Sequence, residues 1–207
     1  MWVVGTLLLG CGHATASGSA GESAAPIGSE AGEIAEIGKS APDFELTDLE
    51  GNPVRLADHR GKTVVLEWMN IDCPVWRGRM EELAATHGRF VSDGSGDVVW
   101  LNVDSTYYIS PEKLREFATA NGVTRTMLVD PTGRVGRMYD ARTTPHMFVI
   151  DDKGVLIYDG ALDNQKSRGA DDPFVNHVSA ALDATLAGGT VSEPKTLPYG
   201  CSVKYKK

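Results

Sequence analysis

The sequence predicts an α/β domain of three layers with a mixed central β-sheet. Short apolar runs rich in β-branched residues alternate with longer segments whose apolar residues recur at helical spacing. Further short runs are joined in pairs by turn-rich loops, which is typical of β-hairpins. A chain of 207 residues, 42% of them hydrophobic, is long enough for one such domain with a substantial core.

The first half of the predicted domain contains a hairpin, a buried strand and a helix. Alternating runs at 41–47 and 53–56 flank the turn residues 48–52, so they predict an antiparallel hairpin at the N-terminus of the domain. The β-branched apolar run 63–69 predicts a buried strand. The apolar residues of 80–91 then recur at helical spacing.

The second half adds two buried strands, a hairpin and two helices. Continuous apolar runs predict strands at 98–103 and 126–130, with a helix between them that Ser110 caps. Alternating runs predict a hairpin over 146–158, and an apolar stripe predicts a last helix over 174–186.

The domain is expected to span 41–189 and to be followed by an irregular C-terminal tail. This tail, 190–207, contains two prolines and no apolar periodicity, and it carries Cys201. The sequence therefore predicts a tail mobile enough to bring Cys201 toward other parts of the domain.

Residues 1–10 predict a lipoprotein signal peptide. Their apolar run is too short to span a bilayer and ends in Leu-Leu-Gly-Cys, which resembles the lipobox of bacterial lipoproteins. In that family the cysteine, here Cys11, becomes the lipidated first residue, and Gly12 after it resembles the pattern sorted to the outer membrane. The alternative is a merely hydrophobic N-terminus, because the run lacks a basic residue before it.

The stretch 11–40 is rich in Gly, Ala, Ser and Glu and predicts a flexible tether. We therefore expect a cell-envelope protein, in the periplasm and attached to the membrane only through its lipid. The formal net charge of −8 argues against binding to nucleic acid. No phosphate loop or dinucleotide fingerprint occurs, so no cofactor is expected.

Cys73 lies where the strand 63–69 gives way to a helix. Pro74 has a fixed φ and no N–H, so it suits the first helical position and makes Cys73 the N-cap. Unpaired N–H groups and the helix dipole there favour a reactive thiolate. The alternative is a buried cysteine without chemistry. If Cys11 is lipidated, Cys73 and Cys201 remain as a pair that can form a disulfide outside the cytosol.

Residues 37–187 resemble the thioredoxin-fold redoxins, a group that includes the alkyl hydroperoxide reductase/thiol-specific antioxidant family. The resemblance rests on Ala-Pro-Asp-Phe at 41–44, on Arg-Gly-Lys before the strand at 63–69, and on Cys73 at the place of the reactive cysteine. Thr-Thr-Pro at 143–145 resembles the loop whose cis proline faces the reactive sulfur in that fold. The ending around Cys201 resembles a subset of secreted redoxins with a C-terminal cysteine.

The resemblance implies an antioxidant thiol oxidoreductase in which Cys73 attacks a peroxide or a disulfide, with an unknown thiol as reductant. Cys201 is the candidate resolving thiol. The expected substrate pocket consists of Asn70, Pro74, Trp76, Thr144 and Pro145.

Two departures leave the reaction type open. Trp76 stands where Cys-X-X-Cys reductases have their second cysteine, and Leu66 and Asn70 replace the Pro and the Thr or Ser of typical peroxiredoxins. The alternatives are a non-catalytic binding or scaffold module and a metal chaperone. His146 and Met147 suggest a soft-metal site, but no Cys-X-X-X-Cys pair accompanies them, so no metal is expected.

Overall fold

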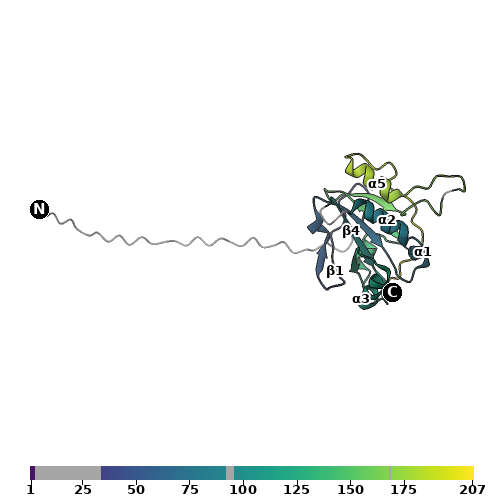
Figure 1. Cartoon of the computed structure of the whole chain (residues 1–207), viewed down its shortest axis with the longest axis horizontal. Coiled ribbons are helices and arrows are strands. Elements are labelled where there is room, and N and C mark those ends of the chain that lie inside the picture. Colours follow the sequence, from purple (N-terminus) through teal and green to yellow (C-terminus); the bar gives the residue numbers. More distant parts are fainter. Residues whose placement is uncertain (3–33, 92–95, 168) are drawn as a thin grey trace.

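The computed structural model describes residues 1–2, 34–91, 96–167 and 169–207. Within them, a seven-stranded sheet in the order β2-β1-β5-β4-β3-β7-β8 forms the centre of the domain (Figure 1). Strands β3, β4 and β5 pair in parallel, whereas β1, β2, β7 and β8 pair antiparallel to their neighbours. This mixed sheet confirms the predicted fold class. Cys11 and most of the predicted signal peptide and tether lie outside the described residues.

The elements follow the predicted order with four additions. The strands are β1 Glu45–Asp48, β2 Pro53–Arg55, β3 Thr63–Trp68, β4 Val98–Asp104, β5 Thr126–Val129, β6 Thr143–Thr144, β7 His146–Ile150, β8 Leu156–Gly160 and β9 Cys201–Ser202. The helices are the 3-10 helix η1 Leu56–His59 and α1 Pro74–Arg77, α2 Met80–Phe90, α3 Pro111–Asn121, α4 Arg134–Met138 and α5 His177–Leu186. None of the helices in this described part has the length and apolar run that a membrane crossing requires.

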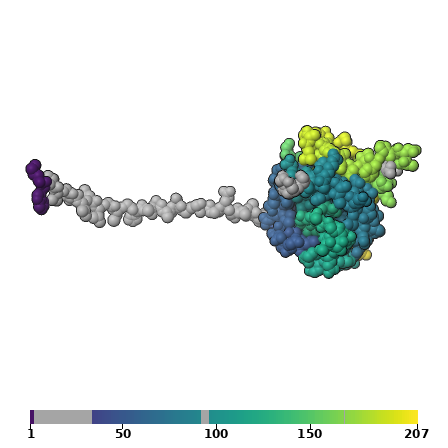
Figure 2. Space-filling view, viewed as in Figure 1, coloured from purple at the N-terminus to yellow at the C-terminus, as the bar shows by residue number. Residues whose placement is uncertain are grey.

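Helices cover both faces of the sheet. On one face α2, α3 and α5 bury Leu83, Leu114 and Leu182 against the strands. Figure 2 shows α2 and α3, in blue-green and green, on the surface of this face. On the other face Val135 of α4 and Phe44 complete a second apolar cluster. The hairpin β1–β2 extends the sheet because β1 pairs with β5.

The additions are η1, α4 and the two-stranded ribbon β6–β9. Helix α4 has five residues, too few to show apolar periodicity in the sequence. Strands β6 and β9 have two residues each. They pair Thr143 with Ser202 and Thr144 with Cys201, residues that are far apart in the chain and leave no local pattern in the sequence. The predicted helix after Cys73 is also divided into α1 and α2, with the break at Gly78 and Arg79.

Candidate active site

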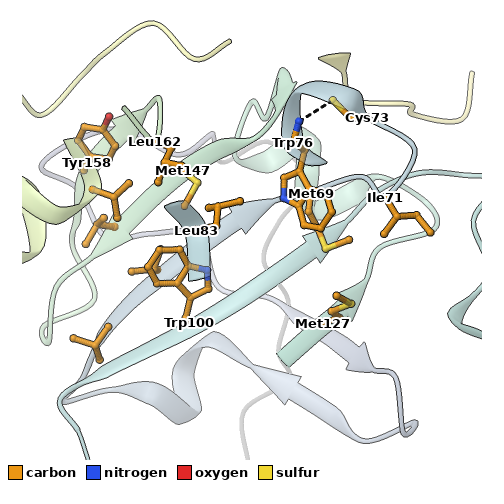
Figure 3. Close-up of a cluster of buried hydrophobic side chains, with 14 of the residues drawn as sticks. Met69, Ile71, Cys73, Trp76, Leu83, Trp100, Met127, Met147, Tyr158 and Leu162 are labelled. Atoms are coloured by element: carbon orange, nitrogen blue, oxygen red, sulfur yellow. Dashed lines mark hydrogen bonds between the residues drawn. The ribbon is translucent and has the colours of Figure 1, made fainter. Parts of the chain in front are cut away.

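Cys73 caps the N-terminus of α1. Its φ and ψ of −84° and 114° are extended, Pro74 occupies the first helical position, and the N–H of Trp76 lies 3.4 Å from the sulfur (Figure 3). This arrangement confirms the cap predicted from the Cys-Pro pair. The cysteine is only 2% exposed, and its Sγ lies 3.1 Å from the carbonyl oxygen of Thr144.

Trp76 fills the position of a local second cysteine and turns into the core. Figure 3 shows its ring pointing away from Cys73 and lying next to Met69. The fully buried indole donates a hydrogen bond of 2.6 Å to Glu67, and Trp100 donates one of 2.8 Å to the same carboxylate. Arg125 forms an ion pair with Glu67 at 3.5 Å. The Trp76 side chain therefore packs in the core under the N-terminus of α1. It lies below the surface that a substrate would reach.

The ribbon β6–β9 brings the C-terminal tail onto Cys73. Cys201 is the cross-strand partner of Thr144, the residue before the cis peptide bond of Pro145. The Sγ atoms of Cys73 and Cys201 lie 2.6 Å apart, although 128 positions separate the two residues. The backbone makes this approach possible at Gly200, where a Cβ would lie 2.1 Å from the Thr144 carbonyl oxygen.

The two thiols differ in their affinity for a proton. Burial by itself raises the pKa of Cys73, but hydrogen bonds with Cys201, with Thr144 and with the N–H of Trp76 outweigh it and hold the pKa below its ordinary value. Burial raises the pKa of Cys201, and its interaction with Cys73 raises it further. Cys73 is therefore the thiol that ionises first, and Cys201 is the one that keeps its proton.

The other predicted site residues have different positions around these sulfurs. Pro74, Thr144 and Pro145 all adjoin Cys73, through α1 or through the loop that contains the cis peptide bond. Asn70 is buried one turn earlier, where its amide bonds to the hydroxyl of Thr106 at 2.9 Å and accepts from the N–H of Asp72 at 2.6 Å. Its side chain therefore holds the loop that leads to Cys73.

The residues considered for a soft-metal site have other partners. His146 accepts a hydrogen bond from the N–H of Arg142 at 3.1 Å and lies 2.8 Å from Asp159 through its second ring nitrogen. Met147 is fully buried in the apolar core. In the part of the chain that the structure describes, no group of three or more His, Cys, Asp or Glu side chains could hold a metal ion.

The residues that fix the tail were not predicted from the sequence. Most of 190–207 has neither helix nor strand, in line with the sequence, yet side chains join it to the domain on both sides of Cys201. Tyr199 and Tyr205 make these contacts, and the signal for them is two aromatic residues flanking a cysteine in an otherwise polar tail. Glu67 was also missed, although one acid within an apolar strand indicates buried donors nearby.

The fold and the cysteine at a helix N-terminus define the class of this protein. The chain belongs to the AhpC/TSA family, whose model matches residues 37–159. Its fold is thioredoxin-like. It is 32% identical over 118 residues to the thiol-disulfide oxidoreductase ResA of Geobacillus kaustophilus, a match that covers 57% of this chain and 65% of that protein.

Solved structures show the same architecture. An uncharacterized conserved protein from Geobacillus kaustophilus superposes with a TM-score of 0.73 at 31% identity, over 84% of this chain and 94% of that one. A putative thiol:disulfide interchange protein DsbE from Chlorobium tepidum superposes with a TM-score of 0.52 at 20% identity, over 74% of this chain and 97% of that one. The second likeness concerns the fold alone.

Proposed function

We propose that this chain catalyses thiol–disulfide exchange, with Cys73 as the attacking thiol and Cys201 as the resolving thiol. The observation that carries the proposal is the 2.6 Å contact between the two sulfurs. The cap position and the lowered pKa of Cys73 fit an attacking thiolate. The relatives named thiol-disulfide oxidoreductase support the same class of reaction.

The reaction needs two exchange steps. The Cys73 thiolate attacks one sulfur of a substrate disulfide, forms a mixed disulfide and releases the other sulfur as a thiolate. Cys201 loses its proton and attacks the Cys73 sulfur, which releases the second substrate thiolate and leaves a Cys73–Cys201 disulfide. Two electrons and two protons thus pass from the protein to the substrate. An external dithiol then restores both cysteines.

Disulfides suit this site better than peroxides. A peroxide must be oriented by a nearby donor, and Asn70 is the residue expected to supply one. Both ends of its amide are engaged with Thr106 and Asp72, within the loop before Cys73. The exchange of sulfur between two thiols and a disulfide needs no such donor.

We also place the reaction in the cell envelope, with the chain attached through a lipid on Cys11. The lipobox-like residues 8–11 and the tether-like composition up to position 40 support this location. A Cys73–Cys201 disulfide would persist there, outside the reducing cytosol. We expect the product expressed in a bacterial host to partition into detergent with the membrane fraction. A Cys11→Ala variant that partitions in the same way would contradict lipidation.

Replacing Cys201 by Ala should trap the mixed disulfide on Cys73. Without the resolving thiol, only an external thiol can release the substrate, so turnover of a peptide disulfide should fall by about 100-fold at micromolar thiol concentrations. Mass spectrometry under non-reducing conditions should find the substrate peptide on Cys73. In the wild type, the same treatment should give a peptide that joins Cys73 to Cys201.

Hydrogen peroxide serves as the competing substrate in this experiment. Fast turnover of peroxide with no exchange of the peptide disulfide would contradict the proposed reaction. Equal turnover by wild type and by Cys201→Ala, with no adduct on Cys73, would remove the resolving role.

A further inference from the structure

The C-terminal segment 196–205, which we call the strap, contacts the domain on both sides of Cys201. The first contacts lie before Cys201. Thr196 Oγ1 lies 2.6 Å from the Tyr158 hydroxyl and accepts from the N–H of Ala161 at 2.8 Å. A Cβ at Gly160 would lie 2.1 Å from that oxygen, so the strap passes closely over the end of β8. Tyr199 then donates its hydroxyl to the buried carboxylate of Asp163.

After Cys201 the strap contacts the domain again, through Tyr205 on α4. The ring of Tyr205 lies over the backbone of this helix, where a Cβ at Gly133 or Gly136 would come within 2.4 or 2.5 Å of its atoms. Its hydroxyl donates to the carbonyl of Ala141 at 2.7 Å, and the guanidinium of Arg137 lies 4.7 Å from the ring centroid. The two glycines therefore leave the space in which the Tyr205 ring packs, which we call its seat, and a Cβ there would also meet Arg137 or Ser105.

The strand β9 is too short to hold Cys201 in place by itself. It has two residues, and its partner β6 has two. The few hydrogen bonds between such short strands are too little by themselves to offset the entropy lost when a long tail is ordered. The ring of Tyr205 adds apolar contact four residues beyond Cys201. A side chain that restricts the tail in this way raises the effective concentration of the Cys201 thiol at the Cys73 sulfur.

We propose that Tyr205 is a positioning residue for the resolving step, because its seat on Gly133 and Gly136 holds Cys201 against Cys73. This inference rests on the proposed exchange reaction. Its chemical step is the attack of Cys201 on the Cys73 sulfur of the mixed disulfide, which forms the internal disulfide and expels the substrate thiolate. Tyr205 itself touches neither sulfur and exchanges no proton with them.

The same seat limits access to Cys73. Cys73 is buried in this arrangement, with Cys201 in contact with its sulfur. A substrate disulfide can reach the Cys73 sulfur only when Cys201 moves aside. Loosening the strap should therefore leave the first step as fast as in the wild type or faster, while it slows the second.

The test uses dithionitrobenzoate as the disulfide and the reduced full chain. Attack by Cys73 releases one thionitrobenzoate, and resolution by Cys201 releases the second, so the two steps are separate phases of absorbance. In Tyr205→Ala the first phase should be unchanged or faster, and the second should be slower by about tenfold or more. Tyr205→Phe keeps the ring in its seat and should fall between the two.

A second variant leaves the tyrosine in place and fills its seat. Gly136 lies within α4, so Gly136→Ala suits the helix while its Cβ displaces the Tyr205 ring and lies 2.8 Å from the Ser105 hydroxyl, which must also shift. It should reproduce the kinetics of Tyr205→Ala. Leu197→Ala is the matched control in the same strap, because its side chain is 86% exposed, and both of its phases should equal those of the wild type.

The outcomes separate the inference from the proposed function. A slower second phase in both Tyr205→Ala and Gly136→Ala, with the first phase retained, supports the positioning role. An unchanged second phase in both, or an equal slowing of both phases, overturns it. A wild type that releases thionitrobenzoate without ever forming a mixed disulfide on Cys73 instead overturns the exchange reaction, and the positioning role with it.

Discussion

Cys73→Ser should reduce turnover of a peptide disulfide to the uncatalysed rate. The thiolate is the nucleophile in exchange, and a serine hydroxyl in the same cap remains protonated at neutral pH. We expect a loss of more than about a thousandfold, the scale seen when a catalytic nucleophile is removed. Thiol release from the substrate, followed in single-turnover mixing, measures it.

The pH dependence of the wild type is part of the same prediction. Because the pKa of Cys73 is held below its ordinary value, the rate of the first step should rise with pH through that lowered pKa and level off above it. Cys201→Ala removes the hydrogen bond from Cys201, so the midpoint should move to higher pH. A Cys73→Ser variant that retains turnover, or a midpoint above that of a free thiol, would contradict the role of Cys73 as the attacking thiol.

The oxidised protein should be more stable than the reduced protein by several kcal/mol. A bond between Cys73 and Cys201 closes a loop of 128 positions in the unfolded chain. The chain-entropy relation gives about 5 kcal/mol for a loop of this length, with strain or residual structure reducing the gain. The folded structure needs little rearrangement, because the strap already places the two sulfurs together.

Urea unfolding of the two redox forms measures this difference. We expect a higher midpoint and a higher free energy of unfolding for the oxidised form, and no effect of oxidant on Cys201→Ser. Equal midpoints for oxidised and reduced wild type, with the internal disulfide verified by mass spectrometry, would contradict the prediction.

The sequence predicts the architecture well where local patterns are strong. The helix from Pro111 to Asn121 was predicted with its cap at Ser110, because a cap residue, a proline and an apolar face coincide there. The cis state of Pro145 agrees with what the family resemblance implied. The cap at Cys73 needed no resemblance, since the Cys-Pro pair after an apolar strand predicts it directly.

The position of the C-terminal tail could not be predicted from the sequence. Its position depends on the fit of Tyr205 over Gly133 and Gly136 and on the close approach of Gly200 to Thr144. These contacts join residues far apart in the chain and leave no periodic pattern. The composition of the tail indicates an irregular segment, and only its aromatic residues hint that it is held in place.

The distance along the chain between Cys73 and its proposed resolving cysteine has a consequence for redox chemistry. With Trp76 in the local position, a disulfide between Cys73 and Cys201 would span most of the domain, so folding and formation of this disulfide would stabilise each other. By thermodynamic linkage, about 5 kcal/mol of added stability makes the folded dithiol more reducing than the same pair in an unfolded chain by about 100 mV. In the proposed reaction, the length of chain between the two cysteines would thus help to set the reduction potential of the pair.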